Sequence, residues 1–137
     1  SNPGDGVRYP AASEDPHIEA ELCTVIKRSA RNVSKEDAKD YILGYTCGNE
    51  LGALDFVRQD KNVTRARGFD TSGPLGPWLV TDLDTSDLSI KSRVNGEPGD
   101  VVWTGTPSGR SPVKEGDTIE VEIEGIGTLR NEVLAPN

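Results

Sequence analysis

The strongest constraint on the fold is a strict alternation of apolar and acidic residues near the C-terminus. Ile119, Val121 and Ile123 alternate with glutamates, and Gly125 and Gly127 follow closely. A period of two residues puts the apolar side chains on one face of a β-strand and the glutamates on the other. The glycines turn the chain, after which the apolar pattern resumes. The pattern predicts a β-hairpin with one buried face.

Strand signals recur along the rest of the chain. We expect strands over Ala20 to Ile26, Leu43 to Cys47, Trp78 to Thr81, Leu88 to Val94 and Val101 to Thr104. Asn95-Gly96 is a strong hairpin-turn signal. The stretch Gly68 to Pro77 carries three glycines and two prolines, which predicts a structured loop.

Few residues are left for helices. Ser34 is a suitable N-cap for a short helix, with Ala38, Tyr41 and Ile42 as its buried stripe. A helical turn is expected within Leu51 to Arg58. The fold class predicted from these elements is strand-rich α+β.

Length and composition suggest one domain with a thin core. The 137 residues suit a single domain, but only 34% of them are hydrophobic, so a second subunit is expected to complete the core. A formal charge of −8 disfavours nucleic acid or an anionic membrane as partner. No apolar run reaches the length of about 18 residues that a membrane helix needs, and the N-terminus has no signal-peptide pattern, so a cytoplasmic location is expected.

The cysteines and the histidine limit the kinds of site that are open to the chain. Cys23 and Cys47 lack CxxC spacing; a disulfide is one alternative, but a pair of core thiols is favoured. His17 is the single histidine, which excludes a site built from several imidazoles.

Carboxylates offer the clearest candidates for chemistry. Glu19 and Glu21, two residues apart on a predicted strand, point the same way and can hold one hard cation. Glu50 follows the next predicted strand and can complete the set. Taken alone, these glutamates are more simply explained as solvated surface residues. Crowded carboxylates repel one another, so a convergent set favours a bound cation.

Two further segments offer groups that can bind an anion. The turn from Trp103 to Gly109 presents backbone N–H groups and hydroxyls that can receive a carboxylate, although a tight loop bonded to its own backbone is an equal alternative. Arg65 and Arg67 can clamp a carboxylate, although an exposed basic pair is the commoner outcome.

Several short stretches, taken in order, match one known pattern. They are His17 to Ile26, Ala30 to Val33, Leu43 to Thr46, Asn49-Glu50, Arg67 to Thr71, Pro74 to Trp78, Pro98 to Val101, Thr104 to Gly109 and Glu124 to Asn131. Together they resemble the fumarylacetoacetate hydrolase family. Their common order is specific and covers nearly the whole chain.

The resemblance implies a mixed, strand-rich β-sandwich or roll, usually dimeric, that binds Mg²⁺ or a related ion such as Mn²⁺ or Ca²⁺. Members hydrolyse acylpyruvates, decarboxylate oxaloacetate-like acids or isomerise dienedioates. By the same resemblance, Glu19, Glu21 and Glu50 are metal ligands, and Thr106 with Gly105 binds the substrate carboxylate. A small 2-oxo acid is therefore the expected substrate, since a metal can polarise its keto group.

Three residues depart from the family pattern. Glu50 stands where the family usually has Asp, Leu54 where it has Arg, and Arg67 where it has a catalytic Lys. Arginine keeps the charge but cannot release a proton near neutral pH, so Arg67 is expected to bind a substrate carboxylate or to stabilise an enolate. This change favours decarboxylation or enol–keto chemistry over hydrolysis.

Parts of the family pattern are missing from the sequence. The N-terminal lid segment is absent, and Glu97 meets Pro98 directly where the family has more strand and a helix. We expect one catalytic core over residues 1–137. Because excision of a core helix is costly, disordered segments left out of the sequence are favoured over deletion.

Two other functions stay open. A family relative with altered or lost catalysis, which binds a metal and 2-oxo acids, is consistent with Leu54 and Arg67. A β-rich binding module without a metal fits the C-terminal hairpin but leaves Glu19, Glu21 and Glu50 unexplained.

Overall fold

The computed structural model describes residues 1–102 and 110–137, with side chains described through residue 98 and from residue 110 onward. Its elements are β1 (Gly6–Val7), β2 (Pro16–Ile18), β3 (Ala20–Ile26), the 3-10 helix η1 (Ala38–Tyr41), β4 (Ile42–Asn49), β5 (Gly52–Ala53), α1 (Leu54–Asp60), α2 (Thr64–Arg67), β6 (Leu75–Val80), β7 (Ile90–Val94), β8 (Glu97–Val102), β9 (Ser111–Pro112), β10 (Thr118–Ile123) and β11 (Gly127–Val133).

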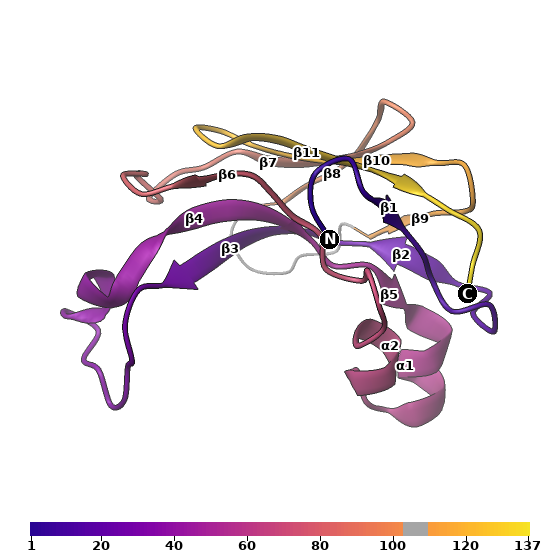
Figure 1. Cartoon of the computed structure of the whole chain (residues 1–137), viewed down its shortest axis with the longest axis horizontal. Helices are drawn as coiled ribbons and strands as arrows, with labels where there is room; N and C mark the ends of the chain where they lie inside the picture. The colour runs from indigo at the N-terminus through magenta and orange to yellow at the C-terminus, as the bar shows by residue number, and fades with distance from the viewer. Residues whose placement is uncertain (103–109) are drawn as a thin grey trace.

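In the described part of the chain, the strands form three sheets. A five-stranded sheet has the order β1-β11-β10-β7-β8, and two three-stranded sheets have the orders β3-β4-β6 and β5-β2-β9. Figure 1 shows β7, β10 and β11 in one layer, β3 and β4 below them, and α1 with α2 beneath β5 at one end. This architecture confirms the predicted strand-rich α+β fold.

The predicted C-terminal hairpin is present. β10 pairs antiparallel with β11, and Ile119 lies opposite Asn131 while Val121 lies opposite Leu129. Ile119, Val121 and Ile123 are at most 1% exposed, whereas the intervening glutamates are only partly buried. The alternation read from the sequence therefore gives the inner face of the five-stranded sheet.

Among the residues whose side chains are described, the core consists of three apolar clusters. The first joins the five-stranded sheet to the β3-β4 layer: Ala20, Cys47, Leu88, Ile90, Val121, Ile123, Ile126 and Leu129. The second lies around β2: Val7, Ile18, Leu51, Val113, Ile119 and Val133. The third packs the helices on β5: Ala53, Phe56 and Ala66. Burial of these side chains holds the layers together at about 25 cal/mol per Å² of apolar surface.

At two places within residues 1–102, the chain passes directly from one three-stranded sheet to the other, between β2 and β3 and between β4 and β5. Glu19 alone separates β2 from β3, and Glu50 with Leu51 separates β4 from β5. The antiparallel register aligns Ala20 with Asn49, so Glu19 and Glu50 meet at the crossing point. The sheet-to-sheet transition thus brings two acidic residues from distant parts of the sequence side by side.

Turn signals were reliable, whereas the predicted helix after Ser34 is wrong. Asn95 and Gly96 have φ angles of 55° and 79°, as a tight hairpin turn between β7 and β8 requires. The Ser34 hydroxyl does accept a hydrogen bond from the Asp37 N–H at 3.2 Å, but only the short η1 follows. Ala38 is exposed, so no apolar stripe is available to stabilise a longer helix.

Several element boundaries also differ from expectation. α1 begins at Leu54, not Leu51, and β6 begins at Leu75, three residues before the predicted start. The part of the Val101 to Thr104 strand beyond residue 102 lies outside the described residues. Neither α1 nor α2, the two α-helices of the described chain, has the length and hydropathy of a membrane span.

Candidate metal centre

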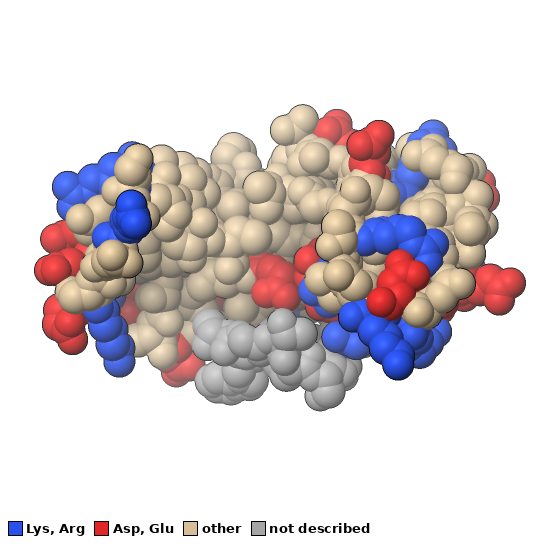
Figure 2. Space-filling model, turned by 90° about the horizontal axis from the view of Figure 1, so that it is seen from below, with Lys and Arg blue, Asp and Glu red and all other residues tan. Residues whose placement is uncertain are grey.

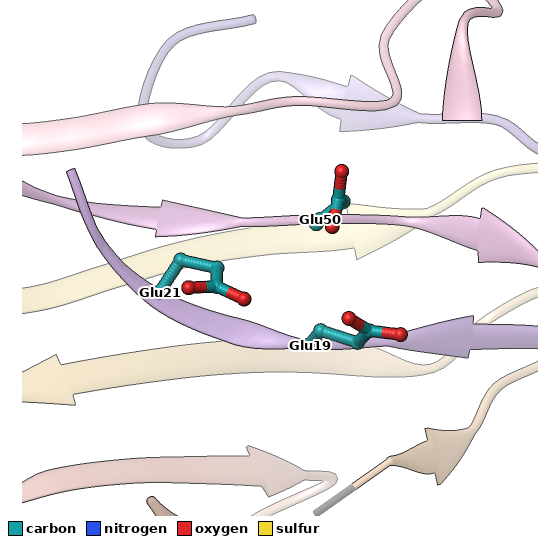
Figure 3. Close-up of side chains that lie close together, drawn as sticks. All are labelled: Glu19, Glu21 and Glu50. Atoms are coloured by element: carbon teal, nitrogen blue, oxygen red, sulfur yellow. The ribbon is translucent and has the colours of Figure 1, made fainter. Parts of the chain in front are cut away.

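The strand register places three glutamates on one face. Glu21 lies opposite Gly48 in the β3-β4 ladder, and Glu19 and Glu50 follow directly after the last pair of that ladder, Ala20 and Asn49. Figure 3 shows Glu19 and Glu21 along one segment and Glu50 on its neighbour. One carboxylate oxygen from each of the three glutamates lies within 4.8 Å of the other two. The convergence predicted from the sequence is therefore present, and its use as a metal site remains a proposal.

The donor set suits a hard divalent cation. All three groups are carboxylates, which are the ligands that Mg²⁺, Mn²⁺ and Ca²⁺ prefer. Glu19 is 4% exposed, and Glu21 and Glu50 are half-buried. Removing carboxylates from water next to one another is costly unless positive charge is close by.

Two arginines supply positive charge at this position. Arg67 lies 2.9 Å from Glu19 and 2.6 Å from Glu50, and the Nε of Arg110 lies 2.8 Å from Glu19. Three carboxylates and two guanidinium groups give the cluster a formal charge of −1. This net negative charge favours the binding of a cation.

Of the two arginines in the Arg65–Arg67 pair, only Arg67 belongs to the cluster. Arg67 ends α2, where its N–H donates to the Val63 carbonyl at 2.9 Å and its carbonyl accepts from the Ser72 hydroxyl at 2.7 Å. Its side chain passes over Gly52, where an added Cβ would lie 3.6 Å from Arg67 Cγ.

Arg65 points to the surface of the helical pair. It donates to both carboxylate oxygens of Asp60, at 2.7 and 2.8 Å, and lies 3.8 Å from the centre of the Phe56 ring. Arg65 is therefore an exposed basic side chain, the commoner of the two outcomes expected from the sequence.

A cavity of about 440 Å³ adjoins the glutamates. It is lined by Glu21, Leu22, Cys23, Gly48, Asn49, Glu50, Arg67, Ser72, Gly73, Pro74 and Leu75. A Cβ at Gly48 would clash with the Cys23 sulfur at 2.3 Å, so the glycine makes room for the thiol. Burial and the nearby carboxylates of Glu21 and Glu50 raise the pKa of Cys23, which therefore carries no negative charge at neutral pH.

Charges of both signs are mixed on the helical side of the molecule. Arg58 pairs with Asp15 at 2.6 Å, and Arg65 pairs with Asp60 at 2.7 Å. Figure 2 shows basic and acidic side chains side by side at that end of the face. The net charge of −8 is therefore not spread as a uniform acidic field over this face.

The structure changes the list of candidate residues in two ways. Thr106 and Gly105 lie outside the described residues, so their assignment to the substrate carboxylate remains a prediction. Sequence reasoning missed Arg110, which directly follows the glycine-bounded turn, and did not use Cys23, which shares its strand face with Glu21.

Cys23 and Cys47 are free thiols, as favoured from their spacing, although only Cys47 is buried.

Comparisons with known proteins agree with this architecture. The family model for the fumarylacetoacetate (FAA) hydrolase C-terminal domain matches residues 1–98 and 97–134. Protein Rv2993c of Mycobacterium tuberculosis is 40% identical over 163 residues, covering 96% of this chain and 62% of that protein. The mitochondrial oxaloacetate tautomerase fahd2 of Xenopus laevis is 34% identical over 172 residues, covering 96% of this chain and 54% of that protein. The solved structure of 5-carboxymethyl-2-hydroxymuconate delta-isomerase from Mycobacterium smegmatis has a TM-score of 0.92 and 38% identity, covering 98% of this chain and 65% of that one.

The matches extend over nearly all of this chain but not over all of its relatives. The chain spans 62% of the M. tuberculosis protein, and the alignment of 163 residues is longer than the 137 residues available here. The relative therefore has residues inside the matched range that this chain lacks. The two segments of the family model meet at residues 97–98, in the β7-β8 hairpin region. With its strand order, sequence and family match in agreement, the chain belongs to the fumarylacetoacetate hydrolase family.

Proposed function

We propose that this chain is the catalytic core of a divalent-metal-dependent enzyme that acts on 2-oxo acids through an enolate. The observation that carries the proposal is the convergence of Glu19, Glu21 and Glu50 within 4.8 Å beside a cavity of about 440 Å³. A cavity of that size suits a small organic acid.

Glu19, Glu21 and Glu50 would hold the metal, with Mg²⁺ as the first candidate and Mn²⁺ or Ca²⁺ as alternatives. A divalent cation in this place supplies a Lewis acid for the keto group and for the negative charge of an enolate. Glu50 has one methylene more than the Asp of the family pattern. Because Mg²⁺ requires ligands at about 2.0–2.1 Å, this longer arm favours a more tolerant ion such as Mn²⁺ or Ca²⁺ relative to the Asp-containing relatives.

Arg67 decides which reaction we favour. Its guanidinium stays protonated at working pH, so it can bind a carboxylate or stabilise an enolate but cannot act as a base. Decarboxylation suits such a group better than hydrolysis, because loss of CO₂ gives the enolate without a base, whereas hydrolysis needs an activated water. In enol–keto conversion, water would carry the proton between oxygen and carbon while Arg67 stabilises the enolate. Two relatives, an oxaloacetate tautomerase and a delta-isomerase, are named for reactions that rearrange a substrate without hydrolysis. These names support the proposal.

The remaining parts of the proposal concern substrate and assembly. Thr106 and Gly105 would receive the substrate carboxylate. We also propose a cytoplasmic homodimer, with neither nucleic acid nor membrane as a partner. Large apolar side chains are exposed on the β3-β4-β6 sheet and its ends, and they support the dimer: Ile26 57%, Leu43 41%, Leu75 48%, Trp78 70% and Leu79 45%.

A turnover assay tests the proposed reaction. Native protein and the Arg67→Lys variant are supplied with oxaloacetate or an acylpyruvate, with Mg²⁺ or Mn²⁺ and with a chelator. The expected result is metal-dependent enol–keto conversion or decarboxylation of oxaloacetate by native protein. If native protein hydrolyses the acylpyruvate as well as the lysine variant does and leaves oxaloacetate unchanged, the role given to Arg67 is wrong.

A second candidate function is supported by Leu54 and by the ion pairs of Arg67. Leu54 stands where the family pattern has arginine, and it cannot pair with an anion. Arg67 forms ion pairs with two of the three glutamates, Glu19 and Glu50. A relative with lost catalysis would bind a metal and oxalate, measured by calorimetry, without turning over either substrate.

A further inference from the structure

One guanidinium group bridges two of the three glutamates. Arg67 Nη2 donates to both carboxylate oxygens of Glu19 at 2.9 Å each, and Nη1 lies 2.6 Å from Oε2 of Glu50. The Arg67 side chain is 23% exposed and that of Glu19 only 5%, so water and salt screen the Arg67–Glu19 pair weakly. Arg67, together with Arg110 at Glu19, thus supplies positive charge to these crowded carboxylates.

A divalent ion would need the same oxygen atoms. Carboxylate ligands lie about 2.0–2.6 Å from Mg²⁺ or Ca²⁺. An ion shared by the three glutamates would therefore stand between Glu19 and Glu50, where the Nη atoms of Arg67 already make their contacts. Two cations at hydrogen-bond distance repel each other strongly in a partly buried site. The guanidinium and the ion cannot both hold these oxygens.

The cavity offers the Arg67 guanidinium an alternative position. Arg67 lines the cavity next to the glutamates, together with Ser72 and Gly73. Its Nε atom is buried and has no hydrogen-bond partner within residues 1–102 and 110–137, so its contacts with the glutamates leave a donor unused. A 2-oxo acid in the cavity offers a carboxylate that matches the arginine fork.

We propose that Arg67 is the built-in counter-ion of the metal-free site, and that a divalent cation displaces its guanidinium from Glu19 and Glu50 into the cavity, where it binds the substrate carboxylate. The inference rests on the proposed function and adds an order to it: the cation binds first and thereby prepares the substrate site. A lysine in this position has a single ammonium group and cannot bridge two carboxylates with a fixed fork. The arginine therefore weakens metal binding relative to lysine.

Calorimetry with Mg²⁺ tests the competition in the metal-free protein. Arg67→Gln should bind Mg²⁺ about tenfold more tightly than native protein, and Arg67→Lys should lie between them, because a competing cation is removed or weakened. Arg65→Gln is the matched control: it removes an arginine from the same helix whose partner is Asp60, and Mg²⁺ affinity should not change. Equal or weaker Mg²⁺ binding by both Arg67 variants would overturn the competition.

Oxalate, a dicarboxylate that mimics a 2-oxo acid, tests the transfer of the guanidinium. Native protein should bind oxalate only when Mg²⁺ is present, and Arg67→Gln saturated with Mg²⁺ should bind it about tenfold less tightly. Oxalate binding to native protein that is equally tight with and without Mg²⁺ would overturn the proposed order.

Nitrogen-15 NMR of the arginine side chains follows the same event in native protein. The Arg67 signal, assigned by its absence in Arg67→Lys, should move as Mg²⁺ is added, whereas the Arg65 signal should stay. An unmoved Arg67 signal in protein that binds Mg²⁺ overturns this inference alone. A lack of Mg²⁺ and Mn²⁺ binding in every variant overturns the proposed metal centre as well.

Discussion

The backbones of Glu19 and Glu50 are hydrogen-bonded to each other in both directions. The N–H of Glu19 donates to the Glu50 carbonyl at 3.0 Å, and the N–H of Glu50 donates to the Glu19 carbonyl at 2.8 Å. The two carboxylates are therefore brought together by the strand ladder, independently of any ion.

Metal removal should consequently leave the fold intact. Treatment with a chelator is expected to preserve the far-UV circular dichroism of the strands. The melting temperature should fall only as far as the loss of the metal's binding free energy requires, because ligand binding adds stability by mass action. Differential scanning calorimetry at several Mg²⁺ concentrations measures this shift. Loss of the strand signal on chelation would show that the ion, not the ladder, organises the site.

Gly44 should not tolerate a side chain. An added Cβ would lie 2.5 Å from the Val80 carbonyl oxygen, a backbone atom that cannot move without disturbing the pairing of β4 with β6. We expect Gly44→Ala to lower the free energy of unfolding by about 1–3 kcal/mol, as overpacking does. Gly73→Ala is the control, since a Cβ there meets nothing within 4 Å. Equal stability of the two variants in urea titrations would contradict the close approach at Gly44.

The thiol of Cys47 should make the fold sensitive to alkaline pH. Burial is the main cause that raises its pKa from 9.0 to about 11. Between these values the unfolded chain loses the thiol proton while the folded chain keeps it, so stability present below pH 9 is lost as the pH rises towards 11. Cys47→Ala should show a smaller fall in unfolding free energy over that range. An unchanged pH dependence in the variant would contradict this assignment.

Trp78 should contribute to self-association. Its side chain is 70% exposed on β6, an unusual position for a large aromatic residue, and burial in a second copy would remove this surface from water. Light scattering at micromolar concentrations should give a dimer mass for native protein and a lower mass for Trp78→Ser. Val63→Ser, which removes a 49%-exposed apolar residue next to α2, should remain dimeric. A monomer mass for native protein would contradict the proposed dimer.

Local sequence patterns predicted most of the strands because their signals are local. The alternation at Ile119, Val121 and Ile123 follows from the two-residue period of a strand, and Asn95-Gly96 favours its turn by backbone conformation alone. The helix after Ser34 failed because a good N-cap does not stabilise a helix without a buried face, and no residue of η1 is buried.

The site was only partly predictable for a physical reason. The i, i+2 spacing showed that Glu19 and Glu21 share a face, but the approach of Glu50 depends on pairing between strands about 30 residues apart, which no local pattern reveals. The ion pairs of Arg67 and Arg110 with Glu19 depend on tertiary packing in the same way. The resemblance of the ordered motifs to one family supplied the long-range information that spacing lacked.

Calorimetric titration of metal-free protein with Mg²⁺ and Mn²⁺ tests the metal centre most directly. Native protein should bind one divalent ion per chain, and Glu21→Gln should weaken binding roughly tenfold or more, because the number of charged ligands sets cation affinity. Glu115→Gln, which neutralises an exposed glutamate in the turn before β10, should bind as native protein does. Unchanged affinity in Glu21→Gln would contradict the assignment of the three glutamates to one metal ion.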